Sequence, residues 1–174
     1  NVIRESLEIN AVPHYSMINE DTGYIVLRKF NKKASSQTIK ALNSLKNLGA
    51  KNIILDLRGN PGGLLNEAVN IVNIFVPKGQ LVVTTKSKVK KYNKTYYTQR
   101  EPIDLDIPVV VLINGRSASA SEIVSGALQD LDRCVVIGSR SFGKGLVQRP
   151  KPLTYGTQMK ITISRYYTPS GRCI

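Results

Sequence analysis

The chain has 174 residues, of which 41% are hydrophobic and 21% are charged, a composition typical of one soluble globular domain with a sizeable core. No stretch approaches the roughly 18 unbroken apolar residues of a membrane-spanning helix. Residues 1–5 lack the apolar core of a signal peptide, so neither a transmembrane segment nor a signal peptide is predicted in this chain. Cys134 and Cys173 are too few for a disulfide framework and lie in no metal-binding pattern.

Basic residues outnumber acidic residues by 25 to 12, which gives a formal charge of +13. A lysine cluster between Lys86 and Lys94 falls in an alternating stretch that also contains Tyr92, Tyr96 and Tyr97. Such a cluster is compatible with nucleic-acid binding through charge and ring stacking. Because tyrosine is also a common strand former, we favour a solvated basic surface on a hairpin, and no nucleic-acid partner is expected.

Hydrophobic patterning predicts alternating strands and helices. Gly49 is expected to end the first helix in a left-handed conformation, and Ser35 or Ser36 is expected to cap its start. This alternation predicts an α/β domain with helices packed on a mixed sheet, plus a lysine-bearing β-hairpin. In chain order we predict strands at 5–17 and 23–30, a helix at 35–48, a strand at 52–57, a helix at 64–75, a hairpin at 81–85 and 92–98, a strand at 109–113, a helix at 119–129, and strands at 134–137, 145–148 and 158–166.

Three loops that follow predicted strands carry the candidate functional residues, as is common in α/β domains. The first contains Asn60, Pro61, Gly62 and Gly63 just before a predicted helix. Glycines at a helix start leave backbone N–H groups free to face an anion. A tight turn would need only one glycine, so we favour a backbone anion site here.

The second loop contains three alternating serines, Ser117, Ser119 and Ser121, followed by Glu122. Ser119 and Glu122 match a capping box, so helix capping is one role for this serine. A serine at a helix start is also placed where the helix dipole favours developing negative charge, which suits a nucleophile. The pattern alone does not distinguish among the three serines.

The third loop contains Lys144, followed by Gln148. If Lys144 begins a strand, the two side chains share a face. A lysine normally has a pKa near 10.4 and works as a base only where its surroundings lower that value toward about 7–8. The single histidine, His14, lies on a predicted strand far from these loops in sequence, so a serine hydrolase here requires a lysine base.

Two alternatives compete with a hydrolase. Residues 138–144 fit the phosphate-loop pattern G-x-x-x-x-G-K, but Gly145 replaces the expected Ser or Thr and the next segment reads as β structure. We therefore reject nucleotide binding. A non-catalytic peptide- or nucleic-acid-binding module on the same fold is the second alternative, and the presence of Ser119, Lys144 and Gln148 argues against it.

Together these segments resemble the carboxyl-terminal processing (tail-specific) proteases, peptidase family S41. Residues 55–63, 117–122 and 142–145 resemble three blocks of that family in the same order, and residues 166–172 resemble a later block. The resemblance runs over nearly the whole chain. It implies the α/β core shared by crotonase-like and Clp-type proteases.

By position, the resemblance makes Ser119 the nucleophile, Lys144 the general base and Gln148 the residue that orients the lysine. It implies an oxyanion hole formed by the backbone N–H groups of Ser119 and Gly63, with Gly62 as the alternative to Gly63. No metal or organic cofactor is required in this family's chemistry.

The implied activity is a serine endopeptidase that cleaves unfolded or tail-exposed polypeptides through an acyl-enzyme. Its substrates are expected to have apolar carboxyl termini, and its location is expected to be the bacterial periplasm or another extracytoplasmic space. Family members carry a PDZ domain before this core and continue beyond its end. Residues 1–174 are therefore expected to form a single catalytic domain without those parts.

Overall fold

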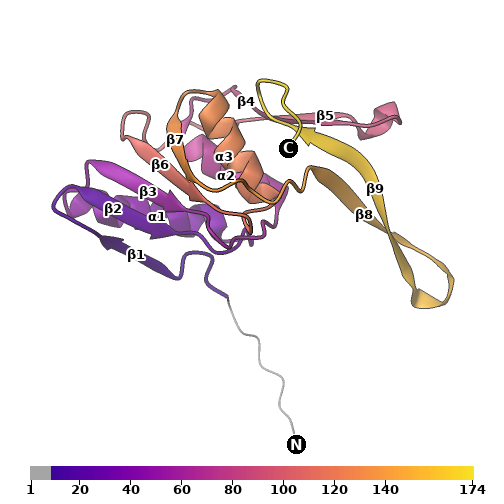
Figure 1. The fold of residues 1–174 in the computed structure, drawn as a ribbon, viewed down its shortest axis with the longest axis horizontal. Coiled ribbons are helices and arrows are strands. Elements are labelled where there is room, and N and C mark those ends of the chain that lie inside the picture. Colours follow the sequence, from indigo (N-terminus) through magenta and orange to yellow (C-terminus); the bar gives the residue numbers. More distant parts are fainter. Residues whose placement is uncertain (1–8) are drawn as a thin grey trace, which may run out of the picture.

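The computed structural model describes residues 9–174, which form two β-sheets and three α-helices (Figure 1). The helices are α1 (Ala34–Asn47), α2 (Leu65–Phe75) and α3 (Ala120–Asp130). The first sheet has the order β1 (His14–Met17), β2 (Thr22–Val26), β3 (Asn52–Asp56), β6 (Val109–Ile113) and β7 (Cys134–Gly138). The second has the order β5 (Lys94–Tyr97), β4 (Leu81–Lys86), β9 (Gln158–Tyr167) and β8 (Leu146–Pro152), with short 3-10 turns at Lys90–Tyr92 and Thr154–Gly156.

The five-stranded sheet and the three helices form the body of the molecule. Strands β2, β3, β6 and β7 are parallel, and β1 joins the edge in the antiparallel sense, so the sheet is mixed as predicted. Strand β3 is a short apolar run whose Ile53 and Leu55 are buried, as expected for a central parallel strand. Helix α2 packs against both α1 and α3, and their apolar faces complete the core. The α/β fold is therefore confirmed.

The four-stranded sheet is antiparallel and includes a long β8–β9 ribbon that projects away from the body (Figure 1). The predicted lysine-bearing hairpin is present as β4 and β5. The sequence did not show that β4 also pairs with β9, which makes this hairpin part of a separate four-stranded sheet. At the tip of the ribbon, Tyr155 is 99% exposed.

The ends of the first helix show which local signals were reliable. Gly49 adopts a φ of 98°, which confirms the left-handed helix end. The predicted serine cap was wrong, because Lys33 occupies the N-cap position. The Ser35 N–H instead donates to Glu67 Oε2 of α2 at 2.7 Å, so a carboxylate from a neighbouring helix does the capping.

The first predicted strand is shorter than expected, since β1 begins at His14. Residues 5–8 of that prediction lie outside the described residues. Among residues 9–174, the helices are all too short or too polar to traverse a lipid bilayer.

Candidate active site

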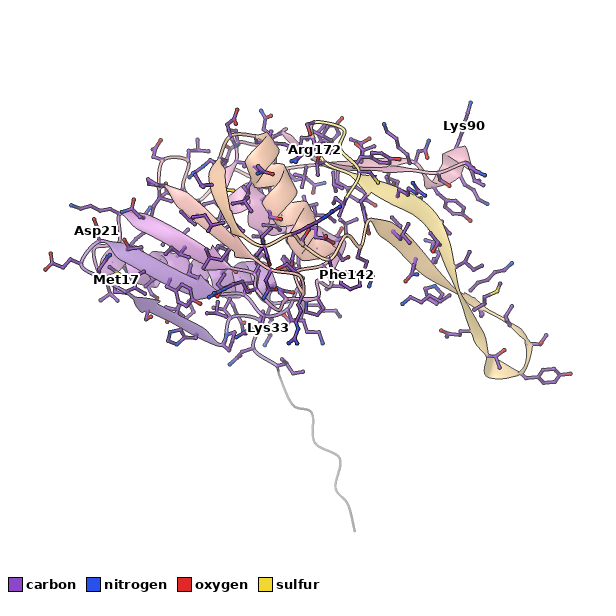
Figure 2. All side chains as sticks on the ribbon, in the orientation of Figure 1. Met17, Asp21, Lys33, Lys90, Phe142 and Arg172 are labelled. Carbon is purple, nitrogen blue, oxygen red and sulfur yellow. The ribbon has the colours of Figure 1, made fainter. Side chains whose placement is uncertain are left out.

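Three loops at the carboxyl ends of β3, β6 and β7 are joined by hydrogen bonds. The Ala118 N–H donates to Asn60 O at 3.0 Å, which links the first two loops. The Phe142 N–H donates to Ser117 O at 3.0 Å, which links the second loop to the third. Figure 2 shows Phe142 near the point where the β8–β9 ribbon leaves the body. The structure thus brings together the three segments that the sequence singled out.

Ser119 occupies the N-cap of α3 in a strained backbone conformation. Its φ of 56° and ψ of −111° are unusual for a residue with a side chain. A sharp strand-to-helix turn of this kind presents a serine oxygen at the top of a sheet in α/β hydrolases. Gly62 lies directly against it, since a Cβ at Gly62 would sit 2.6 Å from Ala118 O and 2.9 Å from Ser119 Cβ. Close approach of the two loops therefore requires glycine at this position.

The other two serines of the loop have structural roles. Ser117 is fully buried, and its Oγ donates to Leu57 O at 2.8 Å. Ser121 is also fully buried, and its Oγ donates to Asn60 O at 2.9 Å. Ser119 is only half-buried. It is therefore the member of the three whose hydroxyl is placed to meet a ligand.

Glu122 connects the second loop, which carries Ser119 (the serine loop), to the third loop, which carries Lys144 (the lysine loop). Its carboxylate is buried and accepts three backbone hydrogen bonds, from Ser119 N at 2.7 Å, Gly143 N at 2.5 Å and Lys144 N at 2.9 Å. The bond to Ser119 is the predicted capping-box contact. The bonds to the lysine loop were missed, because no sequence pattern shows that residues 143 and 144 fold back onto this helix start.

We expected Lys144 and Gln148 to share one face of a strand that begins at Lys144, and the structure has no such strand. Strand β8 begins at Leu146, after the lysine, and its pairing with β9 shifts register between Val147 and Gln148. The side chains of Lys144 and Gln148 are exposed. Within residues 9–174 no hydrogen bond joins Lys144 Nζ to Ser119 Oγ, so it is their backbones that Glu122 brings together.

The three backbone amides predicted to hold an oxyanion differ in their hydrogen bonding. The Gly62 N–H donates to Asn60 Oδ1 at 2.9 Å, and the Ser119 N–H is taken by Glu122. The Gly63 N–H has no hydrogen-bond partner in the described part of the chain. Gly63 has a φ of 153°, and a Cβ there would sit 2.3 Å from Phe30 O, so only glycine fits.

A second polar cluster, which sequence reasoning missed, follows β3. Arg58 donates to both oxygens of Asp56, through Nε at 3.0 and 3.1 Å and through Nη2 at 2.8 Å. The Tyr24 hydroxyl also donates to Asp56 Oδ2, at 2.5 Å. Burial of Asp56 opposes its charge, but the hydrogen bonds from Arg58 and Tyr24 outweigh burial and lower the pKa of this carboxyl. In the sequence, the only sign of this cluster was an aspartate and an arginine two residues apart at the end of a predicted strand.

Three further possibilities considered from the sequence were a catalytic histidine, a phosphate loop and a metal site. His14 is exposed on edge strand β1, and its Nε2 bonds Ser16 Oγ at 3.1 Å. No helix follows β7, since residues 139–145 are irregular and lead into β8, so the phosphate-loop alternative is excluded. A search of residues 9–174 finds no group of three or more His, Cys, Asp or Glu side chains placed to hold a metal ion.

Comparison with known proteins places this chain in a family. The family model of Peptidase family S41 matches residues 21–174, and the chain belongs to this family of serine proteases. The resemblance drawn from the sequence blocks is thereby confirmed.

Similar proteins carry consistent names. The carboxy-terminal-processing protease of Bartonella bacilliformis is 40% identical over 179 residues, covering 99% of this chain and 40% of that protein. A probable CtpA-like serine protease of Staphylococcus epidermidis is 38% identical over 172 residues, covering 98% of this chain and 34% of that protein. The chain thus spans about two fifths or less of the length of these relatives.

Solved structures show the same fold. The photosystem II D1 C-terminal processing protease superposes with a TM-score of 0.83 at 32% identity, over 98% of this chain and 47% of that chain. A putative S41 protease from Bacteroides fragilis gives a TM-score of 0.80 at 21% identity, over 97% of this chain and 49% of that chain. The crotonase- and Clp-like core implied by the sequence resemblance agrees with these neighbours.

Proposed function

We propose that this chain carries the catalytic machinery of a serine endopeptidase, with Ser119 as nucleophile and Lys144 as general base. The observation that carries the proposal is the placement of Ser119. It starts α3 in a strained conformation, against Gly62, and one carboxylate holds both its amide and the amide of Lys144. The two residues therefore lie on segments fixed to each other, which is what a two-residue catalytic unit requires.

The reaction proceeds through an acyl-enzyme. The neutral Lys144 amine takes the proton of the Ser119 hydroxyl as Oγ bonds to the scissile carbonyl carbon. The C–N bond then breaks, and the lysine passes the proton to the departing amine. Water adds to the ester, giving one proton to Lys144, and the serine recovers its proton as the carboxylic acid product leaves. Since the lysine side chain is exposed in this structure, its amine must turn from solvent toward Ser119 for the first step.

The oxyanion is assigned first to the Gly63 N–H, because that group is unoccupied while the Gly62 N–H is bound to Asn60. A preorganised amide of this kind stabilises the charge that develops on the carbonyl oxygen. The Ser119 N–H can become the second donor only when Glu122 releases it. Gln148 retains its proposed role of orienting the lysine once the Lys144 amine has turned toward Ser119.

The substrate is proposed to be an unfolded polypeptide with an apolar carboxyl-terminal tail. A cavity of about 390 Å³ supports this, since its walls include the apolar side chains of Leu65, Val147 and Ile163 beside polar and basic groups, among them Gln148, Lys91, Lys94 and Arg149. Such walls suit an apolar side chain next to a few polar groups. Membership of the family supports a single catalytic domain working in an extracytoplasmic space, without a metal or organic cofactor.

The test is digestion of an unfolded, apolar-tailed polypeptide by the wild type and by Ser119→Ala and Lys144→Ala. Each variant is expected to lose at least about a thousandfold in kcat/KM. Ser36→Ala and Lys78→Ala are matched controls, because both side chains are exposed and lie outside the site, and both should retain wild-type rates. Wild-type cleavage by Ser119→Ala would eliminate the proposed nucleophile.

A further inference from the structure

Basic charge in this chain is concentrated in the second sheet. The segments 81–98 and 146–167, which contain its four strands, hold nine of the 25 Lys and Arg residues and none of the 12 Asp and Glu residues. The rest of the chain is nearly balanced by comparison. A solvated surface ordinarily mixes both signs, so the absence of acidic residues from these segments calls for a physical role.

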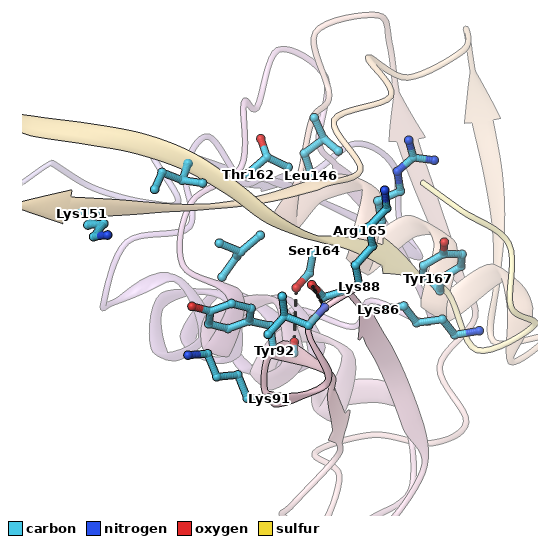
Figure 3. Close-up of a pocket in the computed structure, with 14 residues that line it drawn as sticks. Lys86, Lys88, Lys91, Tyr92, Leu146, Lys151, Thr162, Ser164, Arg165 and Tyr167 are labelled. Carbon is cyan, nitrogen blue, oxygen red and sulfur yellow. Dashed lines mark hydrogen bonds between the residues drawn. The ribbon is translucent and has the colours of Figure 1, made fainter.

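These charges line a groove on the second sheet, which we call the basic groove. It has a volume of about 1080 Å³ and lies between the turn after β4 and the β8–β9 ribbon (Figure 3). Its walls carry five basic side chains and no acidic one, namely Lys86, Lys88, Lys91, Lys151 and Arg165.

Among residues 9–174, the five cations of the basic groove have no acidic partner. The ion pairs found within residues 9–174 all lie elsewhere, at Asp56, Asp104 and Asp130. Two of the groove lysines rest over tyrosine rings, Lys86 at 4.7 Å from the Tyr167 centroid and Lys91 at 5.2 Å from that of Tyr92. The groove therefore presents concentrated positive charge that the described part of the chain does not neutralise.

The basic groove adjoins the 390 Å³ cavity and the segment that follows Lys144. It shares Lys91, Tyr92, Ile163 and Ser164 with the 390 Å³ cavity that contains Gln148. At its other side it includes Leu146, which lies two residues after Lys144. A polypeptide that occupies the smaller cavity can therefore extend into the groove.

We propose that the basic groove binds an acidic segment of the polypeptide substrate, a few residues from the scissile bond. This inference rests on the proposed peptidase function and adds a substrate class to it. Charge complementarity favours a chain rich in Asp and Glu. A flat bilayer does not enter a concave groove, and each tyrosine already has a lysine over one ring face, which argues against base stacking.

The test measures binding separately from cleavage. The Ser119→Ala chain is titrated with fluorescent peptides that share one apolar tail and differ in four residues, Asp and Glu in one and Asn and Gln in the other. The acidic peptide is expected to bind about tenfold more tightly at low salt, and the difference should shrink as ionic strength rises, because the pairs are solvent-accessible. Equal binding of the two peptides would overturn the inference.

A triple variant locates the effect. Changing Lys86, Lys88 and Lys91 to Gln on the Ser119→Ala background should remove the preference for the acidic peptide. The matched control changes Lys32, Lys40 and Lys51 to Gln; these exposed lysines of the body remove the same net charge and should leave the preference intact. If both triple variants lost the preference for the acidic peptide equally, the preference would depend on net charge alone, and the proposal would be overturned. Tighter binding of single-stranded DNA or phosphatidylglycerol vesicles than of the acidic peptide would also overturn it.

Cleavage of the same two peptides by the wild type separates the two proposals. A retained binding preference with no cleavage of either peptide would remove the peptidase function while leaving the groove. Cleavage of both peptides with the same kcat/KM would remove the substrate inference while leaving the peptidase function.

Discussion

The body and the second sheet of this molecule are stabilised in different ways. In the body, β2, β3 and β6 carry buried apolar side chains. The polar residues of its loops are tied into a dense set of hydrogen bonds around Glu122 and Asp56. The second sheet is antiparallel, its β8–β9 ribbon is largely exposed, and its charges are of one sign. The difference fits the two proposals above, in which the body fixes the geometry for chemistry and the second sheet offers a surface to the substrate.

The largest contrast should appear when one leucine is truncated in each region. Leu55 of β3 is fully buried, so Leu55→Ala is expected to lower the free energy of unfolding by about 2–5 kcal/mol through lost burial and a residual cavity. Leu153 near the ribbon tip is 47% exposed, and Leu153→Ala should change it by less than about 0.5 kcal/mol. Urea unfolding measures both, and similar losses in the two variants would contradict the comparison.

Removing the charge of Glu122 should have the next largest effect. Glu122→Gln replaces an acceptor of three backbone N–H groups with a side chain that also donates, and we expect a loss of about 2 kcal/mol in stability. Because the serine and lysine loops then lose their common anchor, peptide hydrolysis should fall at least about tenfold.

Glu101→Gln is the matched control, since Glu101 is exposed and lies outside the site. It should leave both stability and hydrolysis within error of the wild type. An unchanged rate in Glu122→Gln, measured on the same peptide, would show that this carboxylate does not position the site.

Much of the body was predictable from local sequence. Strand β3 and the helices follow hydrophobic periodicity, and Gly49 ends α1 where a left-handed residue was expected. Each of these signals acts within a few residues, so no knowledge of the rest of the fold was needed. The three candidate loops were found for the same reason, because each follows a strand and carries glycine or serine patterns.

The second sheet was not predictable in the same way. Strand β4 pairs with β9 across a long separation in sequence, and no local pattern specifies that partner. Strand β8 begins only at Leu146, so the alternation expected from Lys144 to Gln148 did not apply. The role of Glu122 toward Lys144 also depends on tertiary contact, which is why only its capping half was foreseen.

Acid should act on the body more than on the second sheet, whose strands contain no carboxylate. Hydrogen bonds from Arg58 and Tyr24 outweigh the burial of Asp56 and lower its pKa in the folded state. A lowered folded pKa contributes stability that is complete above the unfolded value and is lost as pH falls through the folded value.

Asp56→Asn is therefore expected to reduce the free energy of unfolding by about 1–2 kcal/mol at pH 7, and by progressively less below about pH 4. Unfolding in urea at several pH values measures this trend. Asp106→Asn, an exposed aspartate of the body, should change stability by less than about 0.5 kcal/mol throughout. A deficit in Asp56→Asn that persists undiminished in acid would mean that the carboxyl makes no favourable contact in its charged form.

The smallest expected effect is the difference in stability between glycine and alanine at a strained position in each region. Ser119 in the body has φ 56° and ψ −111°, and Tyr155 at the ribbon tip has φ 60° and ψ 32°. Alanine and glycine are compared at each position, because only glycine escapes the steric penalty of positive φ. Glycine should exceed alanine in stability by about 1 kcal/mol at position 119, where ψ is the less favourable, and by about 0.5 kcal/mol at position 155.

In an ordinary helix the order is reversed, since glycine is less stable than alanine by about 1 kcal/mol. A glycine advantage at position 119 would therefore mean that the fold maintains backbone strain at Ser119, at the start of a helix. The advantage at position 155 would give the cost of positive φ in an exposed turn for comparison. If alanine were the more stable residue at 119, the serine would be an ordinary helix cap, and its strained geometry would no longer support a role as nucleophile.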